Sequence, residues 1–353
     1  MLTRNSRRCF ERLVSRSKSR PVSNEMKRNI SRWLVLLLAS FPLSAEGTLA
    51  ARTNRELRTV VFRSKLVRAT LPYIVILPAG YGAVANRKNR YPVVYLLHGF
   101  GGHYSSWLPA NDSLSTLATQ HQIIIVAPEG NNGWYTDSAT IPTDKYETYL
   151  LREVMPDVQR RFRTIRARSG RGIAGFSMGG YGALKFGLKH PGQFILAASL
   201  AGPMTTASWT ENMLTEMKKV GSSIRAAFGP EGSPTREAND LFKLVRKVPA
   251  NDTAPQPYLY IACGDKDSII DGNREIARLL SDRQILHEFH EVSGGHDLSL
   301  YNDHLAAIIR LTARIARDRT TKNARILFTT GRKENAARSR RKSTLRFSTS
   351  GDE

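Results

Sequence analysis

Three features of this 353-residue sequence could together carry out nucleophilic catalysis: a serine between two glycines, a histidine after a glycine pair, and an acidic loop. The serine is Ser177, within Gly175-Phe176-Ser177-Met178-Gly179, which has the pattern G-x-S-x-G. A serine hydroxyl attacks a carbonyl carbon only when a base takes its proton and an acid orients that base. After a turn of this type the acid is expected first along the chain and the base second.

The best candidate for the base is His296, in the sequence Ser-Gly-Gly-His-Asp at 293–297. It follows a predicted strand at 286–292 and precedes a predicted helix at 304–316, and this position suits the base. Four other histidines suit structural roles: His287 and His290 lie inside that strand, His190 ends a helix, and His98 precedes Ser177 and is expected to shape its own loop.

The acid is expected in the loop Cys263-Gly264-Asp265-Lys266-Asp267, which follows a predicted strand at 257–262. Asp265 and Asp267 are both near enough to the base, so the residues alone leave both open. The developing oxyanion needs two N–H donors. We expect one from the amide of Met178, the residue after the serine, and the other from the amide of Phe100, in His98-Gly99-Phe100-Gly101-Gly102.

These residues depend on a strand, a sharp turn and a helix, and the residues around Ser177 predict all three. The apolar segment 172–176 predicts a buried strand, and the segment 180–189 has helical spacing. A Cβ at Gly175 or Gly179 is expected to collide with neighbouring backbone in such a turn.

Further predicted strands alternate with helices, which indicates an α/β fold: a mostly parallel sheet with helices on both faces. In such a sheet, ligands bind beyond the carboxyl ends of the strands, where all the loops named above fall. The predicted strands are 60–67, 72–77, 91–97, 123–127, 172–176, 194–200, 257–262 and 286–292, with a helix at 146–162.

A segment is inserted between Gly202 and Asn251, where this architecture commonly carries elements that cover the active site. Its apolar residues recur at steps of three or four, which predicts one helical face, formed by Trp209, Met213, Met217, Val220, Ile224 and Phe228. This face either packs on the domain or also walls the acyl pocket. In the second case Trp209 and Met213 bind substrate, with Trp134 and Tyr135 opposite them.

The net charge of +23 is concentrated at the two ends of the chain. Residues 1–32 hold ten basic and two acidic residues, and residues 317–353 hold eleven basic and four acidic ones. A nucleic-acid groove is therefore not indicated, and no nucleic-acid partner is expected. With Cys9 in the leader and Cys263 in the domain, neither a disulfide framework nor a thiolate metal site is expected.

The N-terminal segment predicts export. A basic stretch from Met26 precedes the apolar run 33–41 and a small-residue exit at Ala45, as in a secretory signal peptide, and Ala50 is the second choice for cleavage. The predicted organisation is a start-site extension or leader at 1–25, a signal peptide at 26–45, a catalytic domain at 56–316 and a basic mobile tail at 317–353. We expect a secreted or periplasmic protein that is not inserted in the membrane after cleavage.

Five stretches resemble the esterase family of α/β-hydrolases, which includes tributyrin esterases, feruloyl esterases, S-formylglutathione hydrolases and the antigen 85 mycolyltransferases. They are YLLHGFGG, WYTDS, GFSMGGYGALKFGLKHP, CGDKD and GGHD, within roughly 60–316. The tributyrin and feruloyl branch is the most similar. Family members usually read C-G-x-x-D in the acid loop with the last aspartate catalytic, so the resemblance assigns the acid to Asp267.

Two classes of function fit these observations. The first is a secreted serine carboxylesterase that acts on short-chain or small aromatic acyl esters through an acyl-enzyme, with no metal or cofactor; an acyltransferase is a variant of it. The second is an exported binding module of the same fold, which would bind polyanions through its basic tail. A pure binder has no reason to keep Ser177, Asp267 and His296 together, which favours the enzyme.

Overall fold

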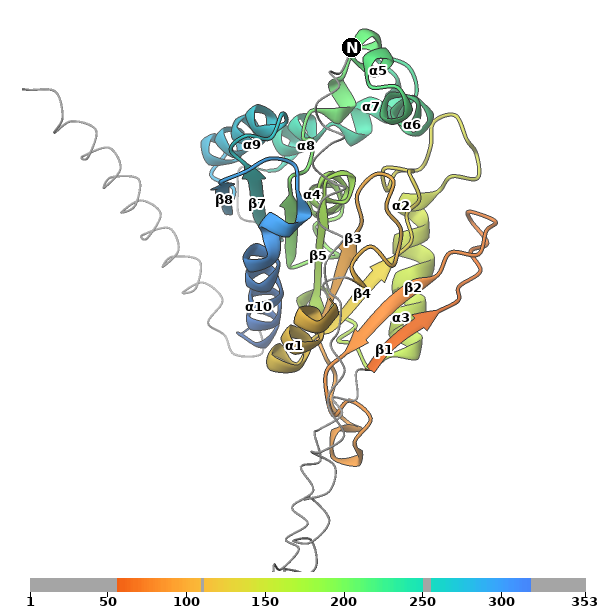
Figure 1. The fold of residues 1–353 in the computed structure, drawn as a ribbon, viewed down its shortest axis with the longest axis vertical. Helices are drawn as coiled ribbons and strands as arrows, with labels where there is room; N and C mark the ends of the chain where they lie inside the picture. The colour runs from red at the N-terminus through yellow and green to blue at the C-terminus, as the bar shows by residue number, and fades with distance from the viewer. Residues whose placement is uncertain (1–55, 109–110, 250–254, 319–353) are drawn as a thin grey trace, which may run out of the picture. The chain divides into compact units, whose positions relative to one another are not determined.

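The computed structural model describes residues 56–108, 111–249 and 255–318 (Figure 1). The predicted leader and signal peptide, and the tail from residue 319 on, lie outside the described residues. Within the described part of the chain, no helix is long and apolar enough to span a membrane.

The described residues form an eight-stranded sheet in the order β1-β2-β4-β3-β5-β6-β7-β8 (Figure 1). β1 pairs antiparallel with β2, β2 pairs antiparallel with β4, and every other pairing is parallel. The strands are β1 (Glu56–Val60), β2 (Tyr73–Leu77), β3 (Val93–Leu97), β4 (Ile124–Pro128), β5 (Arg171–Phe176), β6 (Leu196–Leu200), β7 (Tyr258–Gly264) and β8 (His287–Val292). The predicted mostly parallel sheet is therefore confirmed.

Helices cover both faces of this sheet, as predicted. They are α1 (Asn111–His121), α2 (Tyr146–Tyr149), α3 (Met155–Arg161), α4 (Met178–Lys189), α5 (Glu211–Glu216), α6 (Lys219–Phe228), α7 (Pro234–Asn239), α8 (Leu241–Lys247), α9 (Ile270–Asp282) and α10 (Asn302–Asp318). A π-helical turn at Leu150–Val154 joins α2 to α3, so the helix predicted at 146–162 is present as one helical segment.

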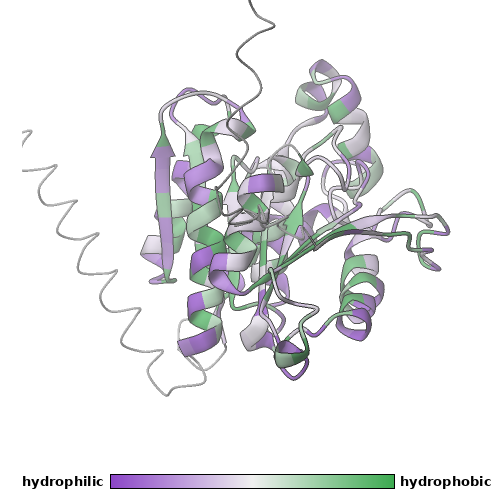
Figure 2. Cartoon of the chain, turned by 60° about the horizontal axis from the view of Figure 1, so that its bottom comes forward, coloured by the Kyte–Doolittle hydropathy of each residue, from purple (hydrophilic) through white to green (hydrophobic). Residues whose placement is uncertain are grey.

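Alternate residues of each central strand feed two separate cores, one on each face of the sheet. In β3, Val93, Tyr95 and Leu97 pack in the first core, whereas Val94 and Leu96 pack in the second. The first core includes residues of α4, α8 and α9, and the second includes residues of α1 and α10. Figure 2 shows the resulting pattern, with apolar residues concentrated in the central strands and polar ones along the outer sides of the helices. Burial on both faces explains why these strands have almost continuously apolar sequences.

Two element predictions were wrong. The strand expected at 60–67 lies earlier, because β1 ends at Val60 and the following residues form a loop with one isolated bridge, Arg63 to Thr70. The apolar stripe from Trp209 to Phe228 is not one helix. It is divided between α5 and α6 by Lys218, whose φ of 47° is incompatible with a continuous helix.

A buried lysine fixes α4 to the segment that precedes α2. The Lys185 ammonium is fully buried and donates to the Tyr135 carbonyl (2.6 Å), Thr136 Oγ1 (2.8 Å) and Glu147 Oε2 (3.0 Å). Burial lowers the pKa of Lys185 to about 8, and the Glu147 carboxylate opposes that shift. Burial alone would raise the pKa of Glu147, but Lys185, His190 and Lys189 hold it well below its usual range.

Removing this lysine should destabilise the domain more than removing its neighbour on the same carboxylate. We expect Lys185→Met to lower the free energy of unfolding by roughly 3 kcal/mol, because it removes one partner from a buried ion pair. The matched control Lys189→Met should cost less than about 1 kcal/mol, since Lys189 is 28% exposed. Urea unfolding measures both, and equal losses would contradict the role assigned to Lys185.

Candidate active site

Ser177 occupies a sharp turn between β5 and α4. Its φ of 54° and ψ of −120° lie in a region that residues with a side chain rarely adopt. Two glycines make this turn possible, as predicted. A Cβ on Gly175 would lie 2.3 Å from the Gly179 carbonyl oxygen, and a Cβ on Gly179 would lie 2.2 Å from the Leu97 carbonyl oxygen. Any other residue at either position would push the turn away from the sheet.

The structure brings the three residues of the predicted triad into one line of hydrogen bonds. His296 Nε2 lies 2.9 Å from Ser177 Oγ, and His296 Nδ1 lies 2.7 Å from Asp267 Oδ2. The Asp267 side chain is 1% exposed and the His296 side chain is 41% exposed. A proton can therefore pass between Ser177 and a solvent-accessible imidazole whose other nitrogen is held by a buried carboxylate.

Asp265, the other candidate for the acid, has a different partner. Its Oδ1 accepts a hydrogen bond from the Gly294 amide at 2.9 Å, and the Gly294 carbonyl accepts one from the Lys266 amide at 2.9 Å. A Cβ on Gly264 would lie 2.3 Å from the Gly294 carbonyl oxygen. Asp265 thus ties the acid loop to the backbone of the loop that carries His296, and does not contact the imidazole.

An aromatic ring that the sequence analysis did not select packs against His296. The Phe176 ring centroid lies 4.9 Å from the imidazole and 5.9 Å from the ring of Tyr301, the last residue before α10. Because Phe176 directly precedes Ser177, the same short segment positions the hydroxyl and one face of the imidazole.

The glycine-rich loop after β3 lies against Ser177. A Cβ on Gly99 would lie 3.3 Å from the Ser177 Cβ, so the backbone next to Phe100 runs close to the hydroxyl. Met178 is the first residue of α4, where backbone N–H groups have no partner within the helix. The two predicted amide donors, Phe100 and Met178, thus come from chain segments on either side of Ser177.

A buried carboxylate that the sequence analysis missed holds this loop. Glu129, directly after β4, lies 3.1 Å from His98 Nε2 and accepts hydrogen bonds from the amides of Tyr104 (3.0 Å) and Asn131 (2.7 Å). Burial alone would raise the pKa of Glu129, but these bonds lower it to about 2. Asn132 adds a further tie, because its side chain accepts from the Gly101 amide at 2.7 Å. The place of Glu129 in the sequence, as an acidic residue just after a predicted buried strand, could have indicated this role.

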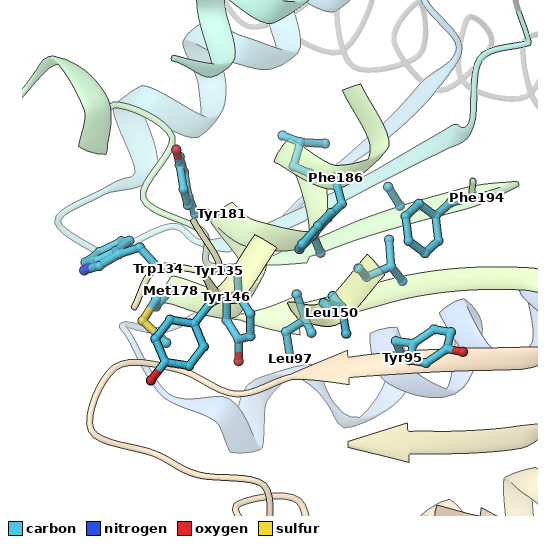
Figure 3. Close-up of a cluster of buried hydrophobic side chains, with 14 of the residues drawn as sticks. Tyr95, Leu97, Trp134, Tyr135, Tyr146, Leu150, Met178, Tyr181, Phe186 and Phe194 are labelled. Atoms are coloured by element: carbon cyan, nitrogen blue, oxygen red, sulfur yellow. The ribbon is translucent and has the colours of Figure 1, made fainter. Parts of the chain in front are cut away.

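Two of the four predicted substrate-binding residues are core residues instead. Trp134 is 2% exposed, and its Nε1 donates to Ser223 Oγ at 2.9 Å. Tyr135 is 1% exposed, and its hydroxyl donates to the His98 carbonyl at 3.0 Å. Figure 3 shows both side chains grouped with Met178 and Tyr181 in the first core. Both side chains are buried in the core, so neither exposes a surface that a substrate could contact.

The other two predicted substrate-binding residues lie in or near α5. Trp209 is 7% exposed and donates from Nε1 to Thr205 Oγ1 at 2.9 Å, so it too is packed and bonded. Met213 is 44% exposed. The inserted segment is held together by Arg236, which donates to the Trp209 carbonyl and to Glu211 Oε1. A joint role of Trp209 and Met213 in walling the acyl pocket stays a prediction.

A mostly parallel sheet, with a strained serine after β5 and an Asp–His pair on the loops after β7 and β8, is the arrangement of the α/β-hydrolase fold. Residues 64–312 match the family described as "Putative esterase". The chain belongs to this esterase family.

Relatives with known names agree with this assignment. The chain is 31% identical over 239 residues to an esterase of Mycobacterium tuberculosis, covering 63% of this chain and 51% of that protein. It is 27% identical over 263 residues to an acetyl esterase of Caldicellulosiruptor saccharolyticus, covering 69% and 93%. A match of 30% over 193 residues to the diacylglycerol acyltransferase/mycolyltransferase Ag85B of Mycobacterium leprae covers 51% and 57%.

Among solved structures, a ferulic acid esterase aligns with a TM-score of 0.63 and 27% identity, covering 74% of this chain and 98% of that one. The fold is therefore shared almost along the whole of that enzyme. The chain spans about half the length of the mycobacterial esterase, so that protein contains further sequence with no counterpart in this alignment.

Replacing Glu129 should change how stability depends on pH. Because its pKa falls from the ordinary 4.5 to about 2 on folding, the carboxylate stabilises the native state above pH 4.5, and this contribution is lost as the pH falls through 2. We expect Glu129→Gln to be less stable than wild type by roughly 3 kcal/mol at pH 7, with the difference shrinking towards pH 2. Urea unfolding at several pH values measures this. The exposed control Glu216→Gln should follow the wild-type profile, and a constant difference for Glu129→Gln would contradict the prediction.

Proposed function

We propose that this protein is a serine carboxylesterase that cleaves small acyl esters through a covalent acyl-enzyme. The observation that carries this proposal is the hydrogen-bonded line from Ser177 through His296 to the buried Asp267. Membership of the esterase family and the resemblance to an acetyl esterase support the same reaction.

In the proposed mechanism, Ser177 Oγ attacks the ester carbonyl carbon while its proton passes to His296 Nε2. Asp267 keeps the other imidazole nitrogen protonated and stabilises the imidazolium that forms. The tetrahedral intermediate then collapses, and the alcohol leaves with the proton from His296. Water attacks the acyl-enzyme in the same way, with His296 again taking the proton, and releases the carboxylic acid and free Ser177.

The negative charge of each tetrahedral intermediate falls on the former carbonyl oxygen. We assign its hydrogen-bond donors to the amides of Met178 and Phe100, because these segments flank Ser177 and Gly99 brings the second one close. The ties from Glu129 and Asn132 support this assignment, since they fix the loop before substrate binds.

A second candidate function is acyl transfer, favoured by the match to the mycolyltransferase Ag85B. The acyl-enzyme would be the same, and a sugar or thiol would replace water as the acceptor. Product analysis with a p-nitrophenyl ester and added alcohols separates the two: an esterase releases mainly the free acid, and a transferase mainly the new ester.

The sequence pattern from Met26 to Ala45 supports export to the periplasm or the cell exterior. We further propose that residues 56–316 form the catalytic domain; α10, its last helix, extends to Asp318. Mass spectrometry of the exported protein tests cleavage after Ala45, with Ala50 as the alternative.

A fluorophosphonate probe tests the proposed nucleophile directly, because it reacts with an activated serine. We expect the wild-type protein to be labelled and Ser177→Ala to remain unlabelled with unchanged thermal stability. Labelling is read on a gel, and Ser199→Ala, at a buried serine of β6, is a control that should stay labelled. A folded wild-type protein that does not react would exclude the esterase.

Asp267 and Asp265 should differ sharply when each is replaced by asparagine. Asp267→Asn should lower kcat by roughly 10⁴, because the amide favours the wrong imidazole tautomer. Asp265→Asn should stay within about tenfold of wild type, since the amide oxygen can still accept from Gly294. Steady-state kinetics at saturating ester compares the two, and the reverse order would move the acid to Asp265.

The acyl group should be small. We expect hydrolysis of p-nitrophenyl acetate and butyrate well ahead of palmitate, because the relatives that support the proposal include an acetyl esterase and a ferulic acid esterase. Comparing kcat/KM across chain lengths measures this. A palmitate optimum would remove the short-chain assignment but leave the serine mechanism untouched.

A further inference from the structure

A group of basic side chains lies at the end of the domain opposite Ser177. Two segments contribute: residues 84–90, which precede β3, and residues 160–168, which precede β5. Neither segment contains an aspartate or glutamate. We call this surface the basic edge. Its members are Arg87, Lys88, Arg90, Arg160, Arg161, Arg163, Arg166 and Arg168.

Backbone hydrogen bonds join the two segments into one surface. The Tyr91 amide donates to the Arg163 carbonyl at 2.8 Å, and the Ile165 amide donates to the Tyr91 carbonyl at 2.8 Å. Arg90 donates across the junction to the Thr164 carbonyl at 3.3 Å. The guanidinium of Arg163 lies 3.8 Å from the centroid of the Tyr81 ring, which fixes it on the same loop.

Most of this charge faces solvent. Arg87, Lys88, Arg90, Arg160, Arg161 and Arg166 are exposed. Asp157, whose side chain is 2% exposed, pairs with both Arg160 and Arg161. Because the two segments hold eight basic residues and no acidic ones, the edge presents a positive field to whatever lies beside it.

The basic edge also contains an exposed apolar residue. Val84 is 72% exposed and belongs to the loop between β2 and β3, which Figure 1 shows in orange, projecting from the lower end of the sheet. The short 3-10 turn that carries it, Val84–Asn86, buries none of its residues. An apolar side chain beside arginines and lysines is typical of a surface that meets lipid headgroups, where it enters the apolar boundary while the cations contact phosphate. A nucleic-acid surface would not need it.

The last helix adds charge at the same end of the sheet. The pKa of His121 is lowered mainly by burial, and further by the nearby positive charges of Arg317 and Arg310 in α10. The helix also contacts the turn Arg168–Gly170. The described chain therefore ends at this edge. The sequence after it, 319–353, holds ten basic and three acidic residues.

We propose that the basic edge docks on an anionic phospholipid surface, with Val84 at the headgroup boundary and the exposed arginines and lysines on lipid phosphates. β5 runs from this edge to Ser177, and its six residues span roughly 20 Å. The docked protein therefore holds its active site away from the bilayer. Substrate reaches it from the aqueous side, and the docking does not require ester hydrolysis.

Vesicle sedimentation with the full chain tests the proposal. The vesicles are phosphatidylcholine alone or phosphatidylcholine with one quarter phosphatidylglycerol, at 0.1 M salt. The edge variants are Lys88→Gln/Arg166→Gln and Val84→Ser. The control for the double variant is Lys218→Gln/Lys219→Gln, which removes two exposed lysines from the inserted segment. The control for Val84→Ser is Val61→Ser, because Val61 is 71% exposed and lies at the opposite end of the sheet. All five proteins keep the same terminal segments, so differences in binding among them cannot come from those segments.

We expect wild type and both controls to bind the anionic vesicles and to release them at 1 M salt. The double edge variant should bind at least about tenfold more weakly, and Val84→Ser about fivefold more weakly. All five should hydrolyse p-nitrophenyl acetate equally, which also shows that they are folded. Absence of binding by wild type, or equal binding by edge and control variants, would overturn the proposal. If the protein instead preferred heparin or duplex DNA, and Val84→Ser did not change that binding, the ligand of the basic edge would be a soluble polyanion and the membrane proposal would be wrong.

Discussion

The closeness of α4 to the sheet is the constraint on which the candidate active site depends. The carbonyl of Leu97 occupies the space where a side chain at Gly179 would be, and the Gly179 carbonyl occupies the space at Gly175. Because neither residue has a side chain, the turn can hold Ser177 with a positive φ directly beyond the sheet. The loop after β3 then comes within contact of the serine, and the loops after β7 and β8 reach it with an acid and a base.

The parts of the site that the sequence predicted were those encoded by short local patterns. Gly175 and Gly179 beside Ser177, and Gly294 before His296, have close contacts or a positive φ that favour glycine. Such local patterns can be recognised from a short stretch of sequence alone. Asp265 and Asp267 could not be separated from residues alone, since they share one loop. Only their partners distinguish them: an amide of Gly294 for one and an imidazole for the other.

Tertiary contacts decided what the sequence left open or predicted wrongly. Trp134 and Tyr135 follow a loop at the active-site end, where an aromatic can line a pocket or fill a core. Tyr135 fills the core because Gly130 and Gly182 leave room for its ring. The stripe from Trp209 to Phe228 had helical spacing throughout, but periodicity does not report the break at Lys218. In the same way, β1 lies earlier than its apolar pattern suggested, because pairing with β2 sets its register.

Two buried carboxylates fix the chain segments on either side of Ser177. Glu129 fixes the loop after β3, and Glu147 receives Lys185 from α4, so one connected segment of chain steadies both sides of Ser177. Each carboxylate is surrounded by donors, which offsets the free-energy cost of burying its charge. Rigid placement of the amides and the hydroxyl before substrate arrives is what electrostatic stabilisation of an oxyanion requires.

His296 depends on β8, one of the two edge strands of the described sheet. β8 is last in the strand order, pairs only with β7 among the described strands, and has mostly half-buried side chains. Its register, with Val292 opposite Gly264, sets where the following loop starts. Local opening of this edge would carry the imidazole away from Ser177 while β5 and α4 stay folded. In the proposed mechanism, catalysis therefore requires β8 to stay paired, and opening of this one strand would abolish it without unfolding the domain as a whole.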